Sequence, residues 1–148
     1  MIVWRLARRT HAALDGEGAR LAAGRWNSWG VPVVYTSEHL SLAVLETLVH
    51  VDADLLPHDL TAFQIEIPER LEMARLDAAQ LPRGWRTRVD RCRKVGDAWI
   101  AEAKSAVLAV PSAVVPRETN FLINPRHADS TEIQVLRAER FQFDPRLR

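Results

Sequence analysis

Cysteine, net charge and long apolar runs are all scarce in this chain of 148 residues. Its single cysteine, Cys92, excludes an internal disulfide and argues against a cysteine-based metal cluster, and it fits a reducing compartment. The formal net charge of +1 gives no electrostatic reason to expect binding to nucleic acid or to a membrane. No apolar run approaches the ~20 residues that span a bilayer, and the N-terminus lacks the pattern of a signal peptide. We therefore expect one cytoplasmic domain over residues 1–148, without direct nucleic-acid or membrane contacts.

Common catalytic and nucleotide-binding motifs are also missing. Gly16 and Gly18 begin like a dinucleotide-binding fingerprint, but Leu21 ends the match and no strand precedes it. No Gly-x-x-x-x-Gly-Lys phosphate loop occurs, and no Gly-x-Ser-x-Gly surrounds Ser112. These absences argue against a Rossmann fold, a P-loop and a nucleophilic serine. For Ser112, a hydrogen-bonding role at the end of a strand is the better hypothesis.

The pattern of apolar residues predicts a mixed α+β fold with several short strands and few helices. Strands are expected at residues 2–6, 31–36, 60–67, 72–76 and 106–110, with a last strand or hairpin between 133 and 143, and residues 120–124 form a small apolar run closed by Pro125. A helix is expected from Ser37, a plausible N-cap, to His50, and another at 97–105. Residues 8–24 are expected to form a loop and 51–59 to break the chain between elements, whereas 77–94 is basic and mixed, with an irregular first part around Pro82 and Gly84.

Glu46 is the most informative residue of the helix that ends at His50. Apolar side chains cover most of the circumference of this helix, which predicts that it is buried, and Glu46 projects between Leu42 and Ala43. Carboxylates are seldom buried without a partner, so an acid in this position favours a functional role. The alternative is a partly wet edge position in which Glu46 pairs with His50. A metal ion shared with His39 is excluded, because His39 and His50 lie roughly 16 Å apart along a helix.

Arg25 and Tyr35 are the other two residues whose positions folding alone does not explain. Arg25 lies in a Gly- and Trp-rich loop where Gly24 and Gly30 allow the backbone to approach a ligand, and its planar fork suits a diphosphate. The alternative is a surface arginine whose stem packs on a tryptophan. Tyr35, the only tyrosine, either buries its ring in the core or stacks on a heteroaromatic ligand. Together with Glu46, these groups suggest a pocket for a ligand with negative charge and a flat ring.

The order and spacing of these residues resemble the RES domain family over nearly the whole chain. The resemblance lies in residues 24–30 (Gly-Arg-Trp-Asn-Ser-Trp-Gly), 33–37, 42–46 and His50, then in 110–127 and 143–147. The arginine, glutamate and serine that give the family its name correspond to Arg25, Glu46 and Ser112. One departure is Ala23, where many members carry the first of two glycines before the arginine, which affects the flexibility of the loop.

The resemblance implies a fold and an activity. The fold would be similar to that of the ADP-ribosyltransferases, a strongly bent, split β structure with NAD in its cleft. The protein would be the NAD-degrading toxin of a bacterial toxin–antitoxin pair, a homodimer neutralised by a helix-turn-helix antitoxin of the Xre class. NAD would be the substrate, so neither a separate cofactor nor a metal is expected.

The resemblance also suggests a role for each candidate residue. We expect Glu46 to hold the ribose and face its developing positive charge, Arg25 to bind the diphosphate, and Tyr35 to orient the nicotinamide. Ser112 would bind nicotinamide or phosphate, and the further candidates for cleft contacts are Arg5 and Asn120. Arg5, in the first expected strand, is solvent-facing unless it finds an anionic partner. The alternatives are ADP-ribosyl transfer to a protein and a nucleotide-binding or interaction module without catalysis.

Overall fold

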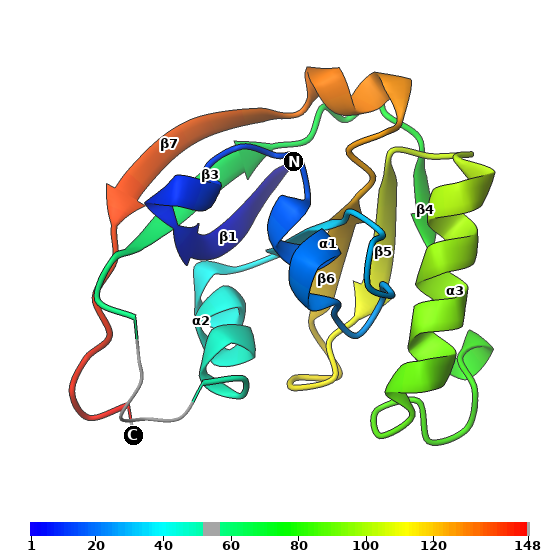
Figure 1. The fold of residues 1–148 in the computed structure, drawn as a ribbon, viewed down its shortest axis with the longest axis horizontal. Helices are drawn as coiled ribbons and strands as arrows, with labels where there is room; N and C mark the ends of the chain where they lie inside the picture. Colours follow the sequence, from blue (N-terminus) through cyan, green and yellow to red (C-terminus); the bar gives the residue numbers. More distant parts are fainter. Residues whose placement is uncertain (52–56, 148) are drawn as a thin grey trace.

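Seven strands form one sheet in the order β4-β5-β6-β2-β1-β3-β7 (Figure 1). The structure is a computed structural model that describes residues 1–51 and 57–147. The strands are β1 (Ile2–Arg8), β2 (Val34–Ser37), β3 (Leu60–Glu66), β4 (Met73–Arg75), β5 (Val107–Pro111), β6 (Thr119–Ile123) and β7 (Gln134–Arg140). The helices are α1 (Glu17–Ala22), α2 (Leu40–Leu48) and α3 (Val89–Glu102), with 3-10 turns at Arg9–His11, Ala78–Gln80 and Ala128–Glu132. Within the described ranges, no helix has the length and apolar character needed to cross a membrane.

The sheet is strongly bent, so that side chains from its two halves meet on one of its faces. Neighbouring strands are antiparallel except β4 and β5, and β2 and β1 join the two halves of the sheet through a single registered pair, Trp4 with Ser37. Side chains from both halves nevertheless share one buried cluster, with Val3, Phe63 and Ile65 on one side of the junction and Val107, Phe121 and Ile123 on the other. This arrangement confirms the predicted α+β fold with a bent, split sheet.

The opposite face of β5 and β6 is covered by α3, which stands beside them in Figure 1. Cys92, Trp99 and Ile100 of this helix pack against Leu108 and Leu122. The helix begins at Val89 and ends at Glu102, so the predicted range of 97–105 was wrong at both ends. Its first half was missed because the basic residues there form the exposed side of the helix and mask the few buried positions in the sequence.

Three further predictions were wrong in detail. Residues 8–24, expected to be a loop, contain the turn Arg9–His11 and the short helix α1. Ser37 is the last residue of β2 rather than a helix cap, and His39 precedes α2 without a capping side chain. The helix α2 is not buried all round: Leu42 and Ala43 are buried, whereas Leu45 is 39% exposed, because α2 packs on the sheet with one side only.

The outcomes are mixed for the last strand, the predicted break in the chain and three further strands. The last strand, β7, pairs with β3 rather than forming a hairpin with the segment that follows it. The predicted break at 51–59 includes residues 52–56, which lie outside the described ranges. The strands predicted at 60–67, 72–76 and 106–110 are confirmed within one residue at most boundaries.

We expect Gly96→Ala to lower the free energy of unfolding by about 2 kcal/mol or more. A β-carbon at this position of α3 would lie 1.8 Å from the Trp26 carbonyl oxygen, so the helix and the 24–30 loop would have to separate. The matched control is Gly18→Ala in α1, where a β-carbon meets nothing within 4 Å. Urea unfolding should show no loss for the control, and equal stability of the two variants would contradict this packing argument.

Candidate active site

The Glu46 carboxylate is held by two donors from distant parts of the chain. Its Oε1 accepts hydrogen bonds from Ser112 Oγ at 2.7 Å and from Asn120 Nδ2 at 2.6 Å. Both donors are buried, Ser112 completely. Within the described residues no hydrogen bond reaches Oε2, so the second oxygen can meet a ligand. The alternative in which Glu46 pairs with the exposed His50 is not what the structure shows.

The two donors are themselves oriented by further hydrogen bonds. Ser112 Oγ accepts from the backbone N–H groups of Val114 and Val115 at 3.0 and 2.9 Å, so its hydroxyl hydrogen is committed to Glu46. Asn120 Oδ1 accepts from Ser37 Oγ at 2.7 Å, which turns the amide nitrogen toward Glu46. Because each polar atom has a defined partner, the carboxylate is held in one orientation.

Tyr35 lies on the same face of β2 as Ser37, two residues earlier, and fixes the 24–30 loop. Its hydroxyl donates to Asn27 Oδ1 at 2.7 Å and accepts from the Trp26 N–H at 2.9 Å. The Asn27 amide is fully buried and also donates to the carbonyls of Ala19 and Val31. Sequence reasoning did not assign this role to Asn27, although an asparagine among glycines and tryptophans was the available signal. Burial raises the pKa of Tyr35 above its ordinary value.

Arg25 is half-buried and bound to backbone carbonyls about sixty residues away. Its Nη1 donates to the carbonyl oxygens of Trp85 at 3.3 Å and Arg86 at 2.9 Å. The buried Cys92 lies beside it: burial raises the pKa of this thiol, and the Arg25 guanidinium opposes that rise. The guanidinium of Arg25 is therefore held by the segment at residues 85–86.

A hollow of about 500 Å³ lies beside the segments that hold Arg25 and Glu46. It is lined by Gly84, Trp85, Arg86, Thr87 and Ala113. The carbonyls of Trp85 and Arg86 bind Arg25, and Ala113 directly follows the serine that binds Glu46. Its size is in the range of small-molecule sites, roughly 300–1,000 Å³. The lining of this hollow is thus connected to Arg25 through the carbonyls of Trp85 and Arg86, and to Glu46 through Ser112, the neighbour of Ala113.

The structure does not bring Arg5 to this group. Trp4 pairs with Ser37, so alternation along β1 places Arg5 on the opposite face of the sheet. There its Nη1 donates to the Ala13 carbonyl at 3.3 Å. Burial lowers the pKa of Arg5, and the nearby Asp15 carboxylate opposes this.

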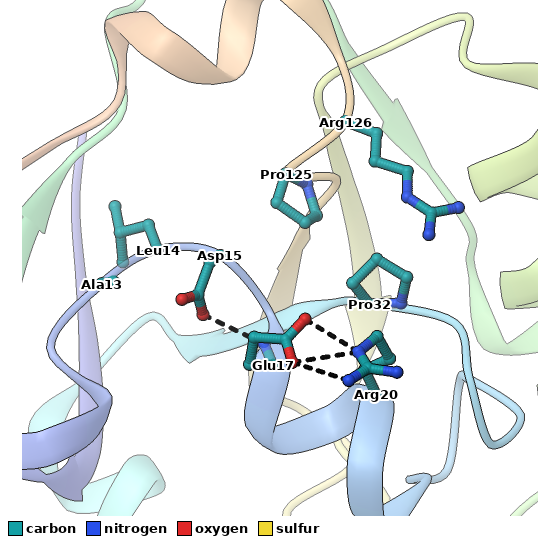
Figure 2. Close-up of a pocket in the computed structure, with 8 residues that line it drawn as sticks. All are labelled: Ala13, Leu14, Asp15, Glu17, Arg20, Pro32, Pro125 and Arg126. Atoms are coloured by element: carbon teal, nitrogen blue, oxygen red, sulfur yellow. Dashed lines mark hydrogen bonds and ion pairs between the residues drawn. The ribbon is translucent and has the colours of Figure 1, made fainter.

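A second hollow, of about 410 Å³, lies at the other end of the β2–β6 pair (Figure 2). It is lined by Ala13, Leu14, Asp15, Glu17, Arg20, Pro32, Pro125 and Arg126. The Glu17 carboxylate accepts three hydrogen bonds of 2.8–3.0 Å from Arg20, as Figure 2 shows, and this partner lowers the pKa of Glu17. Glu17 and Arg20 therefore satisfy each other within this hollow.

Among the described residues, one group could approach a metal ion: Glu38, His39 and Glu118, whose ligand atoms lie within 4.8 Å of one another. His39 Nδ1 lies 3.9 Å from the Glu38 carboxylate and 3.8 Å from that of Glu118. All three side chains are partly exposed. One histidine beside two carboxylates on the surface is an ordinary polar cluster, so we assign no metal to it.

Comparison with known proteins agrees with the sequence motifs. The family model of the RES domain matches residues 2–144. This chain belongs to the RES domain family. Of the three residues that correspond to the family name, Glu46 and Ser112 are in direct contact, and Arg25 binds the carbonyls of Trp85 and Arg86, which line the 500 Å³ hollow.

Similar RES-domain proteins are named as toxins. The chain is 38% identical to the Prs ADP-ribosylating toxin of Sphingobium sp. (strain YBL2), over 97% of this chain and 94% of that protein. It is 40% identical to Toxin Res of Photorhabdus laumondii subsp. laumondii, with 99% and 97% covered. Among solved structures, the fold is similar to a chain of the M. tuberculosis MbcT–MbcA toxin–antitoxin complex, with a TM-score of 0.75 at 18% identity, over 99% of this chain and 85% of that one.

We expect Tyr35→Phe to destabilise this RES domain by about 1–3 kcal/mol near neutral pH, because Asn27 and the Trp26 N–H lose a buried partner. The difference between the wild type and the variant should shrink as pH rises above about 10, the ordinary pKa of tyrosine. The raised folded-state pKa keeps the phenol protonated while the unfolded chain ionises, which favours the unfolded state.

Denaturant unfolding from pH 7 to 11 measures this difference. Tyr35 is the only tyrosine, so subtracting the variant isolates its ionisation from that of the lysines. A difference that stays constant with pH would contradict the assigned burial and hydrogen bonding.

Proposed function

We propose that this RES-domain protein is the toxin of a toxin–antitoxin pair and depletes NAD by cleaving its nicotinamide–ribose bond. The observation that carries the proposal is the Glu46 carboxylate, which Ser112 and Asn120 orient through Oε1. A hollow lined by Ala113 and by Arg86, whose carbonyl binds Arg25, adjoins this group in the chain. The names of the relatives support the toxin role, and that of the Sphingobium protein supports chemistry on an ADP-ribose donor.

The chemistry needs one fixed carboxylate rather than two. Nicotinamide is cationic in NAD and leaves as a neutral ring that keeps the electrons of the broken bond, so no general acid is required. This contrasts with ordinary glycosidases, which use a pair of carboxyl groups. As the bond breaks, positive charge develops on the ribose, and Glu46 stabilises it through its unbonded Oε2. Ser112 and Asn120 complement the negative charge of Glu46 and prevent it from turning away.

The other residues bind and orient the substrate in this proposal. Arg25 has Nη1 engaged with two carbonyls, which leaves Nε and Nη2 to grip the diphosphate. Tyr35 presents its ring to the nicotinamide, while its hydroxyl keeps the 24–30 loop in place. Ser112 and Asn120 act as positioning residues, because their polar atoms are already engaged with Glu46 and its surroundings.

Either of two small acceptors, water or inorganic phosphate, can complete the reaction. Water attacks the ribose carbon and loses a proton, giving ADP-ribose and nicotinamide. Inorganic phosphate gives an ADP-ribose phosphate and nicotinamide without changing the first step. For the biological setting we propose a cytoplasmic homodimer that an Xre-type antitoxin neutralises.

A second candidate function is ADP-ribosyl transfer to a protein, favoured by the name of the Sphingobium relative. The first step is the same, and a nucleophilic side chain of the target replaces water at the ribose carbon. Glu46 and Arg25 keep their roles, so the two functions differ only in the acceptor.

We expect Glu46→Gln to reduce nicotinamide release from NAD by about 10²–10³-fold, because the variant keeps the shape and the Oε1 acceptor but removes the charge. Release of nicotinamide by the purified protein, followed by chromatography, measures this. The exposed Glu69→Gln is the control for loss of one carboxylate and should retain full activity. Wild-type turnover in Glu46→Gln would remove the mechanism, and absence of turnover in the wild type would remove the proposed function.

We expect NAD labelled in its adenylate half to distinguish the two acceptors. If the protein is a hydrolase or phosphorylase, the label added to a cell lysate will appear only in small molecules. Transfer instead leaves label on a protein band, which the Glu46→Gln variant should not produce. A labelled band of equal intensity with the wild type and with Glu46→Gln would show a transfer reaction that does not depend on Glu46.

A further inference from the structure

Arg86 lines the 500 Å³ hollow and is bound through both its backbone and its side chain. Its backbone carbonyl accepts the 2.9 Å hydrogen bond from Arg25, and its own Nε donates to the Ala113 carbonyl at 2.9 Å. The side chain is exposed. Ala113 also lines the hollow and directly follows Ser112, which binds Glu46. The Arg86 side chain therefore bonds the segment next to Ser112, while its carbonyl bonds Arg25.

The Ala113 carbonyl is a weak partner for a guanidinium. It is a neutral acceptor and uses only one of the five N–H donors that arginine carries. In the described part of the chain no carboxylate pairs with Arg86, whereas the neighbouring Arg88 lies 3.5 Å from Asp90. Hydrogen bonds from arginine to an anion are shorter and stronger than those to a neutral carbonyl, and two parallel bonds to one phosphate add to this.

The position of Arg86 complements that of Arg25. Arg25 is anchored by the carbonyl of Arg86 itself, so the two arginines are joined by one hydrogen bond, and Arg86 lines the hollow. Two phosphate groups that are adjacent in one ligand match two arginines that are joined in this way, because each guanidinium binds a phosphate strongly.

We propose that Arg86 is a second anion-binding residue of this hollow and selects diphosphate-bearing ligands. On binding, its guanidinium exchanges the Ala113 carbonyl for a phosphate oxygen, while Arg25 holds the adjacent phosphate. The identification of the ligand as NAD rests on the proposed function. The selection of a diphosphate rests on the hydrogen bonds that place Arg25 and Arg86 next to each other. Arg86 is thus a determinant of substrate specificity, separate from the Glu46 group that carries the chemistry.

The test compares Arg86→Gln and Arg86→Lys with a control, Arg83→Gln. Arg83 lies in the same segment and is exposed but does not line the hollow, so the control removes the same charge from the same region. Steady-state kinetics of nicotinamide release are measured with NAD and with nicotinamide riboside, which lacks phosphate. Thermal unfolding of each variant shows whether it remains folded.

For Arg86→Gln we expect KM for NAD to rise about tenfold with kcat nearly unchanged, which is the loss of one charge-assisted contact. Arg86→Lys should lie between this variant and the wild type, because it keeps the charge but loses the planar fork. Arg83→Gln should match the wild type, and turnover of nicotinamide riboside should be equal in all four proteins. A KM for NAD equal to that of the control, or an equal loss with both substrates, would overturn the proposal.

A direct binding measurement separates this proposal from the proposed function. Calorimetry with inorganic pyrophosphate needs no catalysis, and the wild type should bind it about tenfold more tightly than Arg86→Gln, with the difference reduced by added salt. If the wild type binds pyrophosphate in this way but releases no nicotinamide, the NAD-cleaving function fails and the role of Arg86 stands. If both proteins bind pyrophosphate equally, the role of Arg86 fails whatever the activity.

Discussion

The register of β2 against β6 decides where the carboxylate of Glu46 lies. Ser37 and Asn120 are paired across these strands, and their side chains share the face that α2 covers. A slip of one residue would turn Asn120 to the other face and leave Glu46 with Ser112 alone. The same slip would expose Phe121 and Ile123, which are buried in the cluster on the opposite face. Apolar packing on one face of the sheet therefore maintains the hydrogen bonds on the other.

The position of Arg25 depends on α3 in a comparable way. The 24–30 loop is tied to this helix by Ser28, which donates twice to the Asp97 carboxylate, and by Arg93, whose Nε donates to the Gly24 carbonyl at 2.7 Å. The absence of a side chain at Gly96 allows the helix and the loop to touch. The position of Arg25 is consequently fixed relative to α3 and to the segment that precedes this helix.

The sequence predicted the elements whose pattern is local. Alternating and β-branched runs located most strands, and the helical projection placed Glu46 between Leu42 and Ala43, the two buried residues of α2. It failed where tertiary contacts decide: the basic first half of α3 lacked a visible apolar face, and the leucines of α2 indicated burial although Leu45 is 39% exposed. The bonds from Arg25 to carbonyls near residue 85 leave no trace in spacing or composition, so the second wall of the hollow was not predictable.

The distribution of charge around the hollow bears on which ligands it can retain. Positive charge comes from Arg86, which lines the hollow, and from Arg25, which binds its carbonyl. Negative charge comes from Glu46, which is held by Ser112, the neighbour of the lining residue Ala113. Under the proposed function, a dinucleotide with a cationic pyridinium ring and a distant diphosphate complements both kinds of charge. Cleavage then removes the cationic ring and leaves the diphosphate. The product complements only the arginines, so the chemical step itself weakens binding and favours release.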